Sequence, residues 1–185
     1  MSKFLSPDQF PVNFSQPSFW EYHQHILTRT FGSPHQGCYA LAVAIFLLGL
    51  FRDSLYERAL RTQPPSPYLA TSPLTVPLSL LLLAVGNTLV LTSMYTLGIT
   101  GTYLGDYFGI LMDDMVTGFP FSVCSAPMYY GSTMSFLGTA LWFGKGAGVL
   151  LTVEVLLVYL VALRFEDPFT GMIYEKRERE RAKKE

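Results

Sequence analysis

The sequence predicts an all-α fold, an integral membrane bundle of four transmembrane helices with an N-terminal amphipathic helix at the membrane interface. Half of the 185 residues are hydrophobic, and they fall in long blocks. Lys and Arg are unevenly placed, because seven of the thirteen lie between Arg164 and Lys184. Such a basic tail is typical of a cytosolic segment beside anionic headgroups. We therefore expect one membrane domain over residues 1–185, with a cytosolic tail over 166–185.

The first expected element is an interfacial helix over residues 18–31. Ser18 and Glu21 match the S-x-x-E capping box that begins many helices. Apolar and polar side chains of this segment separate onto opposite helical faces. A short helix of this kind lies on a bilayer rather than spanning it.

Two spans are expected next, over residues 34–54 and 74–97. The first contains "GCYALAVAIFLLGLF" and reaches the length of about 20 residues that crosses a bilayer once its flanks are included. Residues 52–73 between the spans are polar and rich in proline, so they predict an exposed connection.

The third and fourth spans are expected over residues 127–143 and 147–165. Pro127 opens the third apolar segment, and several glycines from Gly144 to Gly148 turn the chain into the fourth. The two segments then form a hairpin that brings Pro127 and Glu166 to the same end of the bundle.

The number of spans has one alternative. With four spans the three arginines at positions 52, 58 and 61 lie opposite the basic tail, against the positive-inside tendency. A three-span arrangement, in which 127–143 does not cross, would move them to the tail's side. We prefer four spans, because 127–143 is uncharged and long enough to pair with the following helix.

A glycine repeat follows the second span, with Gly101, Gly105 and Gly109 at intervals of four. Small residues at this spacing form a groove for a neighbouring helix. They also allow a ligand to approach the backbone, with Asp106 and Tyr107 beside it. Both interpretations stay open at this stage.

Acidic residues at the end of the last span predict a cation-binding site. Glu166 and Asp167 stand before Pro168, which is expected to end the helix there. A helix C-terminus is partially negative, so two anions at that place are unfavourable unless a cation meets them. The alternative is a solvated helix end without function.

A further carboxyl, Glu154, lies about 18 Å deeper along the same helix. An ionisable residue at that depth is a functional-site hypothesis by default, although a protonated or paired packing residue is the alternative. Cys38 and Cys124 belong to no zinc-type spacing, and we expect neither a metal nor a nucleic acid as partner.

Four blocks of the sequence, in this order, resemble the signatures of the small phospholipid N-methyltransferases: "GTYLGDYFGI", "FPF", "PMYYGSTMSFLG" and "EDPFTGMIY". The likeness extends from about Phe19 to Tyr174. The Pro-x-Tyr-x-Gly core at 127–131 is also similar to the isoprenylcysteine carboxyl methyltransferases. Those precede the proline with Arg-His where this chain has Ser125-Ala126, so the phospholipid branch fits better.

The resemblance implies S-adenosylmethionine as methyl donor and Glu166 and Asp167 as residues that bind it. The family's Gly-x-Gly of the second span is matched by Ala84, Val85 and Gly86, so only its second glycine is present. The expected cofactor-binding residues are Ala84, Val85, Gly86, Gly101, Gly105, Pro127, Tyr129, Gly131, Glu166 and Asp167. The expected catalytic residues are Asp106, Tyr107, Glu154 and His35. The candidate general bases are Asp106, Glu154 and His35, and the sequence does not choose among them, while the Tyr107 ring can line a cationic site.

The expected function is methylation of the amine of phosphatidylethanolamine or its mono- and dimethyl forms, yielding phosphatidylcholine. The resemblance implies the endoplasmic reticulum membrane as its location and a membrane phospholipid as its substrate. An isoprenylcysteine carboxyl methyltransferase and a non-enzymatic tetraspan protein that organises lipids remain the alternatives.

Overall fold

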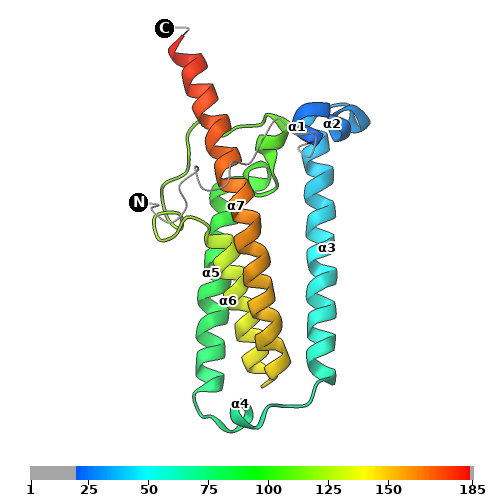
Figure 1. The fold of residues 1–185 in the computed structure, drawn as a ribbon, viewed down its shortest axis with the longest axis vertical. Helices are drawn as coiled ribbons and strands as arrows, with labels where there is room; N and C mark the ends of the chain where they lie inside the picture. The colour runs from blue at the N-terminus through cyan, green and yellow to red at the C-terminus, as the bar shows by residue number, and fades with distance from the viewer. Residues whose placement is uncertain (1–19, 184–185) are drawn as a thin grey trace.

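The computed structural model describes residues 20–183, and this part of the chain is helical without any strand (Figure 1). The predicted all-α fold is confirmed. The helices are α1 (Trp20–Gln24), α2 (Ile26–Phe31), α3 (Pro34–Thr62), α4 (Pro67–Thr71), α5 (Thr75–Thr102), the 3-10 helix η2 (Gly105–Phe108), α6 (Pro127–Trp142) and α7 (Gly146–Ala182).

Two short helices, α1 and α2, replace the single interfacial helix expected over 18–31. His25 between them has the left-handed φ of 53°, which interrupts the helix. The Glu21 carboxylate accepts hydrogen bonds from the Leu27 and Thr28 amides at 2.6 and 3.0 Å, so it caps α2. Burial raises the pKa of Glu21, but its hydrogen bonds from Thr28 and Leu27 outweigh burial and leave the pKa lowered. Ser18, the other half of the expected capping box, lies outside the described residues.

Three helical segments are long and apolar enough to cross a membrane: Pro34–Thr62, Thr75–Phe108 and Gly146–Ala182. They contain three of the four predicted spans, and they are the helices of a multi-pass membrane protein. Helix α3 continues to Thr62, eight residues beyond the predicted end of the first span. The expected exposed connection is therefore shorter, and α4 lies within it.

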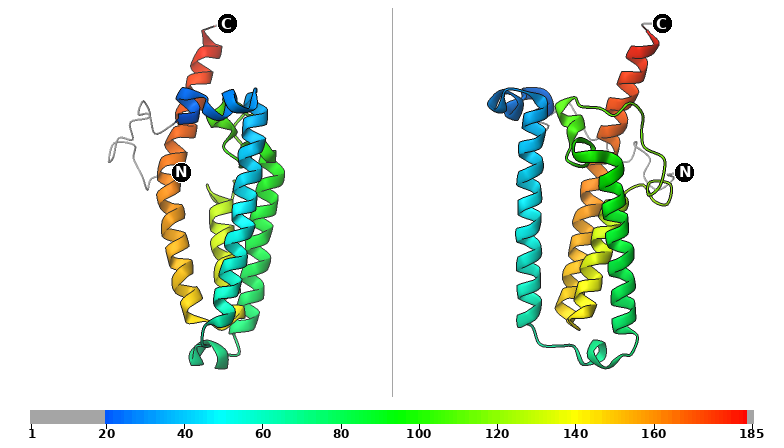
Figure 2. Two further views of the ribbon diagram at one scale, coloured as in Figure 1. Left: turned by 90° about the vertical axis from the view of Figure 1, so that its right-hand side faces the viewer. Right: turned by 180° about the vertical axis from the view of Figure 1, so that it is seen from behind.

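The fourth apolar helix, α6, has 16 residues, about 24 Å of helix. It packs against both α5 and α7 in the bundle (Figures 1 and 2). The contact with α5 is close because Gly86 faces Gly131, and a Cβ built on Gly86 would lie 2.5 Å from the Gly131 carbonyl oxygen. Two turns before Gly86 on α5, the Ser79 hydroxyl donates to the Gly138 carbonyl oxygen on α6 at 2.7 Å.

The last helix does not end at Pro168, as the sequence analysis predicted. Helix α7 extends from Gly146 to Ala182 with Pro168 inside it, so that prediction is wrong. The segment after the proline buries an apolar face, in which Phe169 is fully buried and Ile173 is nearly so. Burial of these side chains offsets the cost of an internal proline. Glu166 and Asp167 are thus inside a helix, and the helix-terminus argument for a cation does not apply to them.

Candidate active site

A cavity of about 660 Å³ opens at the end of the bundle where η2 lies beside α7, the upper end in Figure 1. Its size falls in the usual range for small-molecule sites. The lining comes from α3, α5, η2, the loop 109–126, α6 and α7. Seven of the residues expected from the sequence line it: Gly101, Asp106, Tyr107, Pro127, Tyr129, Glu166 and Asp167.

The Glu166 carboxylate is held by Tyr129. The Tyr129 hydroxyl, on the first turn of α6, donates to Glu166 Oε2 at 2.5 Å. The Tyr129 ring in turn packs edge-on against Tyr159, with ring centroids 4.9 Å apart. The second carboxylate oxygen of Glu166 has no protein partner among the hydrogen bonds of the described residues, so it is available to a ligand.

Asp106 is fixed by a different set of contacts. Its Oδ2 accepts from the Thr170 hydroxyl at 2.7 Å, and its Oδ1 accepts from the Tyr107 amide at 3.1 Å. The Tyr107 ring packs on Phe169 with centroids 4.2 Å apart. These contacts join η2 to the part of α7 that follows Pro168. The continuation of α7 through Pro168 therefore builds the site.

Two residues of α7 that the sequence analysis did not single out, Tyr174 and Arg177, hold the loop 109–126 by hydrogen bonds. The Met112 amide donates to the Tyr174 hydroxyl at 3.2 Å. The Arg177 guanidinium donates to the carbonyl oxygens of Met112 and Asp113, the latter at 2.7 Å. Tyr174 and Arg177 had been expected in a tail beyond the last helix, so no packing role was predicted for them.

The cavity is acidic and aromatic. It is lined by three carboxylates, those of Asp106, Glu166 and Asp167, and none of its described lining residues is a Lys or Arg. Tyrosines 107, 129, 159 and 174 also line it, together with the hydroxyl side chains of Thr102, Ser125, Ser132 and Thr170. Carboxylates and ring faces both attract organic cations. In residues 20–183 no three His, Cys, Asp or Glu side chains are arranged to hold a metal ion.

Comparison with known proteins decides the family. A family described as "Phospholipid methyltransferase" matches residues 74–177. The phosphatidyl-N-methylethanolamine N-methyltransferase of Neurospora crassa is 63% identical over 90% of this chain and 81% of its own length. The enzyme of that name from Saccharomyces cerevisiae is 54% identical over 88% and 82%. The chain belongs to the phospholipid methyltransferase family. Human phosphatidylethanolamine N-methyltransferase is 45% identical over 90% of this chain and 83% of its own.

No solved structure matches this member of the family. Not all of the residues expected from the resemblance line the acidic cavity.

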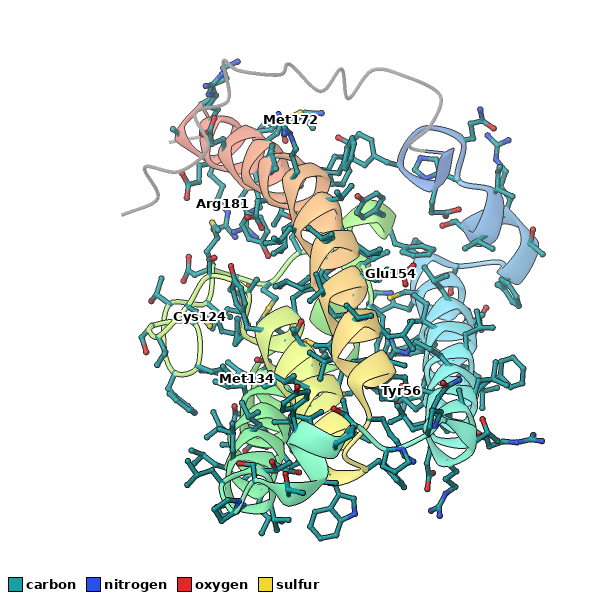
Figure 3. All side chains as sticks on the ribbon, turned by 60° about the horizontal axis from the view of Figure 1, so that its bottom comes forward. Tyr56, Cys124, Met134, Glu154, Met172 and Arg181 are labelled. Carbon is teal, nitrogen blue, oxygen red and sulfur yellow. The ribbon has the colours of Figure 1, made fainter. Side chains whose placement is uncertain are left out.

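Three of those expected cofactor-binding residues, all on α5, are not in the lining of the acidic cavity. Ala84 and Val85 line a second, apolar cavity of about 830 Å³, bounded by α5, α6 and the loop 109–126, which adjoins the acidic cavity at Ser125. Cys124 and Met134, which also line it, appear in Figure 3 on the opposite side of α7 from Tyr56. Gly86 does not line either cavity, because it is buried against α6.

Two further glycines and two proposed catalytic residues are also outside the cavity lining. Gly131 packs on the Gly86 backbone, and a Cβ on Gly105 would meet the Thr100 carbonyl oxygen at 2.6 Å. His35 is exposed in the first turn of α3, and Glu154 is exposed on α7. The structure thus brings Asp106 and Tyr107 to the acidic cavity and leaves His35 and Glu154 away from it.

Proposed function

We propose that this chain transfers methyl groups from S-adenosylmethionine to the amine headgroup of phosphatidylethanolamine or its mono- and dimethyl derivatives, yielding phosphatidylcholine. The observation that carries the proposal is a cavity with three carboxylates and several tyrosine rings, inside a membrane bundle of this family. The identity to fungal enzymes named for the monomethylated lipid supports that lipid as an acceptor.

The donor end of the cavity is proposed at Glu166 and Asp167. When bound, S-adenosylmethionine supplies a methyl group on a positively charged sulfur. Its ammonium and ribose hydroxyls suit the free carboxylate oxygens here, because charge-assisted hydrogen bonds to carboxylates are strong. Tyr129 holds Glu166 in place from one side, while Gly101 and Pro127 leave room beside it. The three carboxylates, with no Lys or Arg among the described lining residues, suit a cationic donor.

The acceptor end is proposed at Asp106 and Tyr107. An alkylammonium with a pKa of about 10.4 must lose a proton before it can attack, which costs about 4–5 kcal/mol at pH 7. Of the candidate bases, Asp106 lines the cavity, so we assign that proton to it. The tyrosine rings orient the cationic headgroup, and alignment of the two reactants supplies much of the rate.

Activity on separate acceptors tests this function. Purified protein given S-adenosylmethionine and the monomethylated lipid is expected to form phosphatidylcholine. Each of the three acceptors, phosphatidylethanolamine and its mono- and dimethyl forms, is supplied alone and the products are separated by mass spectrometry. A prenylcysteine acceptor serves as the control. Methylation of the prenylcysteine, together with failure on every phospholipid amine, would contradict the lipid assignment.

We further propose four spans, with α6 as the third, in the endoplasmic reticulum membrane. Pro127 at the start of α6 lies at the level of the cavity, and Gly144 at its far end accepts a hydrogen bond from the Ser66 amide beside α4, at 2.9 Å. Helix α6 therefore runs alongside the apolar half of α7 from one end to the other. With four spans, α1 and the end of α7 both face the cytosol, where the methyl donor is available.

Cysteine accessibility checks this topology. Cys38 and Cys124 are replaced by alanine, and a single cysteine is then placed at Tyr68, which is 87% exposed on α4. In sealed microsomes this cysteine is expected to be protected from an impermeant maleimide until detergent is added. A single cysteine at Glu178, exposed near the end of α7, is the matched control and should label at once. Labelling at position 68 before detergent would exclude the four-span arrangement.

A further inference from the structure

One face of α3 is turned toward the rest of the bundle, and its upper end is packed. Positions three or four apart on a helix share a face, and on α3 this face carries Cys38, Ala42, Ile45, Gly49, Arg52 and Tyr56. Cys38 and Ala42 are buried, and the Cys38 Sγ donates to the Tyr103 carbonyl oxygen at the end of α5 at 3.5 Å. The upper end of α3 is therefore closed against the bundle.

Two long side chains close the lower end of the same face. Arg52 Nη1 donates to the Tyr159 hydroxyl on α7 at 3.1 Å. The Tyr56 hydroxyl donates to the Phe136 carbonyl oxygen on α6 at 3.0 Å. The lower end of α3 is thus joined to α6 and α7 by side chains that bridge the space between the helices.

Between these two ends α3 is separated from α7 (Figures 1 and 2). In the described part of the chain α3 packs on α2, α5 and η2 and makes almost no close backbone contact with α7. Ile45 is 38% exposed, and a Cβ built on Gly49 would meet no described atom within 4 Å. Ala42 and Arg52 are ten residues apart, so the open stretch is about 15 Å long.

The acidic cavity reaches this open stretch. Ile45 on α3 and Tyr159 and Leu163 on α7 are among its lining residues. We call the gap that these three residues and Gly49 bound the lateral opening. Residues 39–51 of α3 and 155–163 of α7 carry no charged side chain, and both segments belong to candidate spans. One end of the cavity therefore carries the carboxylates, and the other end faces the hydrocarbon of the bilayer.

The length of a phospholipid headgroup matches the distance between these two ends. Asp106 is held by Thr170, and Leu163 and Tyr159 precede Thr170 by seven and eleven residues, about 10 and 16 Å along α7. In the lipid about nine bonds separate the amine from the first acyl carbon, roughly 11 Å when extended at about 1.2 Å per bond. With the amine at Asp106, the acyl chains begin at the level of Leu163 and continue past Tyr159.

We propose that the lateral opening admits the phospholipid acceptor from the bilayer and binds its acyl chains while the amine reaches Asp106. The inference rests on the proposed function, and it names the part of the substrate that the carboxylates do not recognise. Apolar side chains suit this part of the lipid, because acyl chains need no polar partner.

Filling the lateral opening tests this site. Gly49→Leu adds a side chain in open space, and leucine is a better helix former than glycine, so the variant should fold. We expect KM for the monomethylated dioleoyl lipid to rise about tenfold, because the new side chain occupies room that the acyl chains need. KM for the deacylated acceptor glycerophospho-N-methylethanolamine and for S-adenosylmethionine should change less than threefold.

Ala44→Leu is the matched control, since position 44 is exposed on another face of α3 and should leave every KM unchanged. An unchanged KM for the dioleoyl lipid in Gly49→Leu, or an equal rise with the deacylated acceptor, would overturn the proposal. Should Gly49→Leu not fold, Ile45→Trp narrows the lateral opening from the same helix and is read in the same way.

Photolabelling separates this inference from the proposed function, because it needs no catalysis. The probe is a phosphatidylcholine with a diazirine in one acyl chain, and the labelled peptides are identified by mass spectrometry. We expect label on both α3 and α7 in the wild type and in Ala44→Leu, and at least fivefold less in Gly49→Leu. This result would support the acyl-chain site even if the wild type methylates no lipid.

Two labelling results would exclude the site even if the enzyme is active. Equal labelling of α3 and α7 in the wild type and Gly49→Leu would show only bilayer lipid against these helices. Label confined to α5, α6 and the loop 109–126 would place the acyl chains in the second, apolar cavity. A dimer that crosslinks through α3 and is lost in Gly49→Leu would assign the lateral opening to a second copy of the chain instead.

Discussion

Replacing Glu166 with alanine is expected to weaken S-adenosylmethionine binding by about 10- to 150-fold. A hydrogen bond to a charged group contributes about 1.5–3 kcal/mol, and about 1.4 kcal/mol corresponds to tenfold in affinity. Glu166 is partly buried and held by Tyr129, so water replaces the lost contact poorly. Asp167→Ala should have a smaller effect, because Asp167 is exposed at the cavity edge. Calorimetric titration of the purified variants with S-adenosylmethionine measures both.

Two further variants make this result specific. Glu166→Gln keeps an oxygen that can accept from Tyr129 but removes the charge, so it should lose nearly as much affinity as the alanine variant. Glu175→Gln changes an exposed carboxylate on the same helix, paired with Arg179 at 3.6 Å, and should bind the donor normally. Unchanged donor affinity in all Glu166 and Asp167 variants, with slower turnover, would place these carboxylates at the acceptor instead.

Hydropathy predicted the apolar helices well, because a membrane span needs about 20 apolar residues and leaves little choice of position. The predicted starts at 34, 74, 127 and 147 lie within one residue of the observed helices. The course of the chain after Pro168 could not be predicted in this way. A proline is a strong local signal for the end of a helix, but the burial of Phe169 and Tyr174 depends on the loop and η2 that they pack against.

The glycine repeat at 101, 105 and 109 shows why spacing alone did not settle a role. A Cβ on Gly101 would lie 3.3 Å from Met112 Sδ in the cavity. A Cβ on Gly105 would lie 2.6 Å from the Thr100 carbonyl oxygen near the end of α5. Gly109 has the left-handed φ of 74° in open space. Each of the three glycines is therefore accommodated by a different local feature, and none of them forms a groove for a neighbouring helix.

The close contact between α5 and α6 could have been predicted from the sequence by a separate pattern, a repeat of small residues. Small residues recur every seven positions on α5 at Ser79, Gly86 and Ser93, and all three are buried. On α6 Gly131 and Gly138 have the same spacing and face them. A seven-residue repeat of small residues keeps one face of each helix against the other. The resemblance had assigned Gly86 and Gly131 to the methyl donor.

Alanine at Gly86 or Gly131 is therefore expected to destabilise the bundle. The new Cβ would lie 2.5 Å from the Gly131 carbonyl oxygen in one case and 2.6 Å from the Gly86 carbonyl oxygen in the other. Both obstacles are backbone, so α5 and α6 must move apart, which costs about 1–3 kcal/mol of unfolding free energy. Gly131→Val, with two more carbons, should yield no folded protein. Unfolding of the purified variants in detergent measures the loss.

Matched glycines and a donor titration distinguish packing from donor binding. Gly49 and Gly171 are also helical, but a Cβ at either position meets nothing within 4 Å. Alanine at either position should therefore raise the free energy of unfolding slightly. The folded fraction of Gly86→Ala should bind S-adenosylmethionine within about threefold of the wild type, because neither glycine lines the acidic cavity. A normal free energy of unfolding together with a more than tenfold loss of donor affinity would instead place Gly86 and Gly131 in the donor site. The acidic cavity would then extend along α5 from Gly101 toward Gly86.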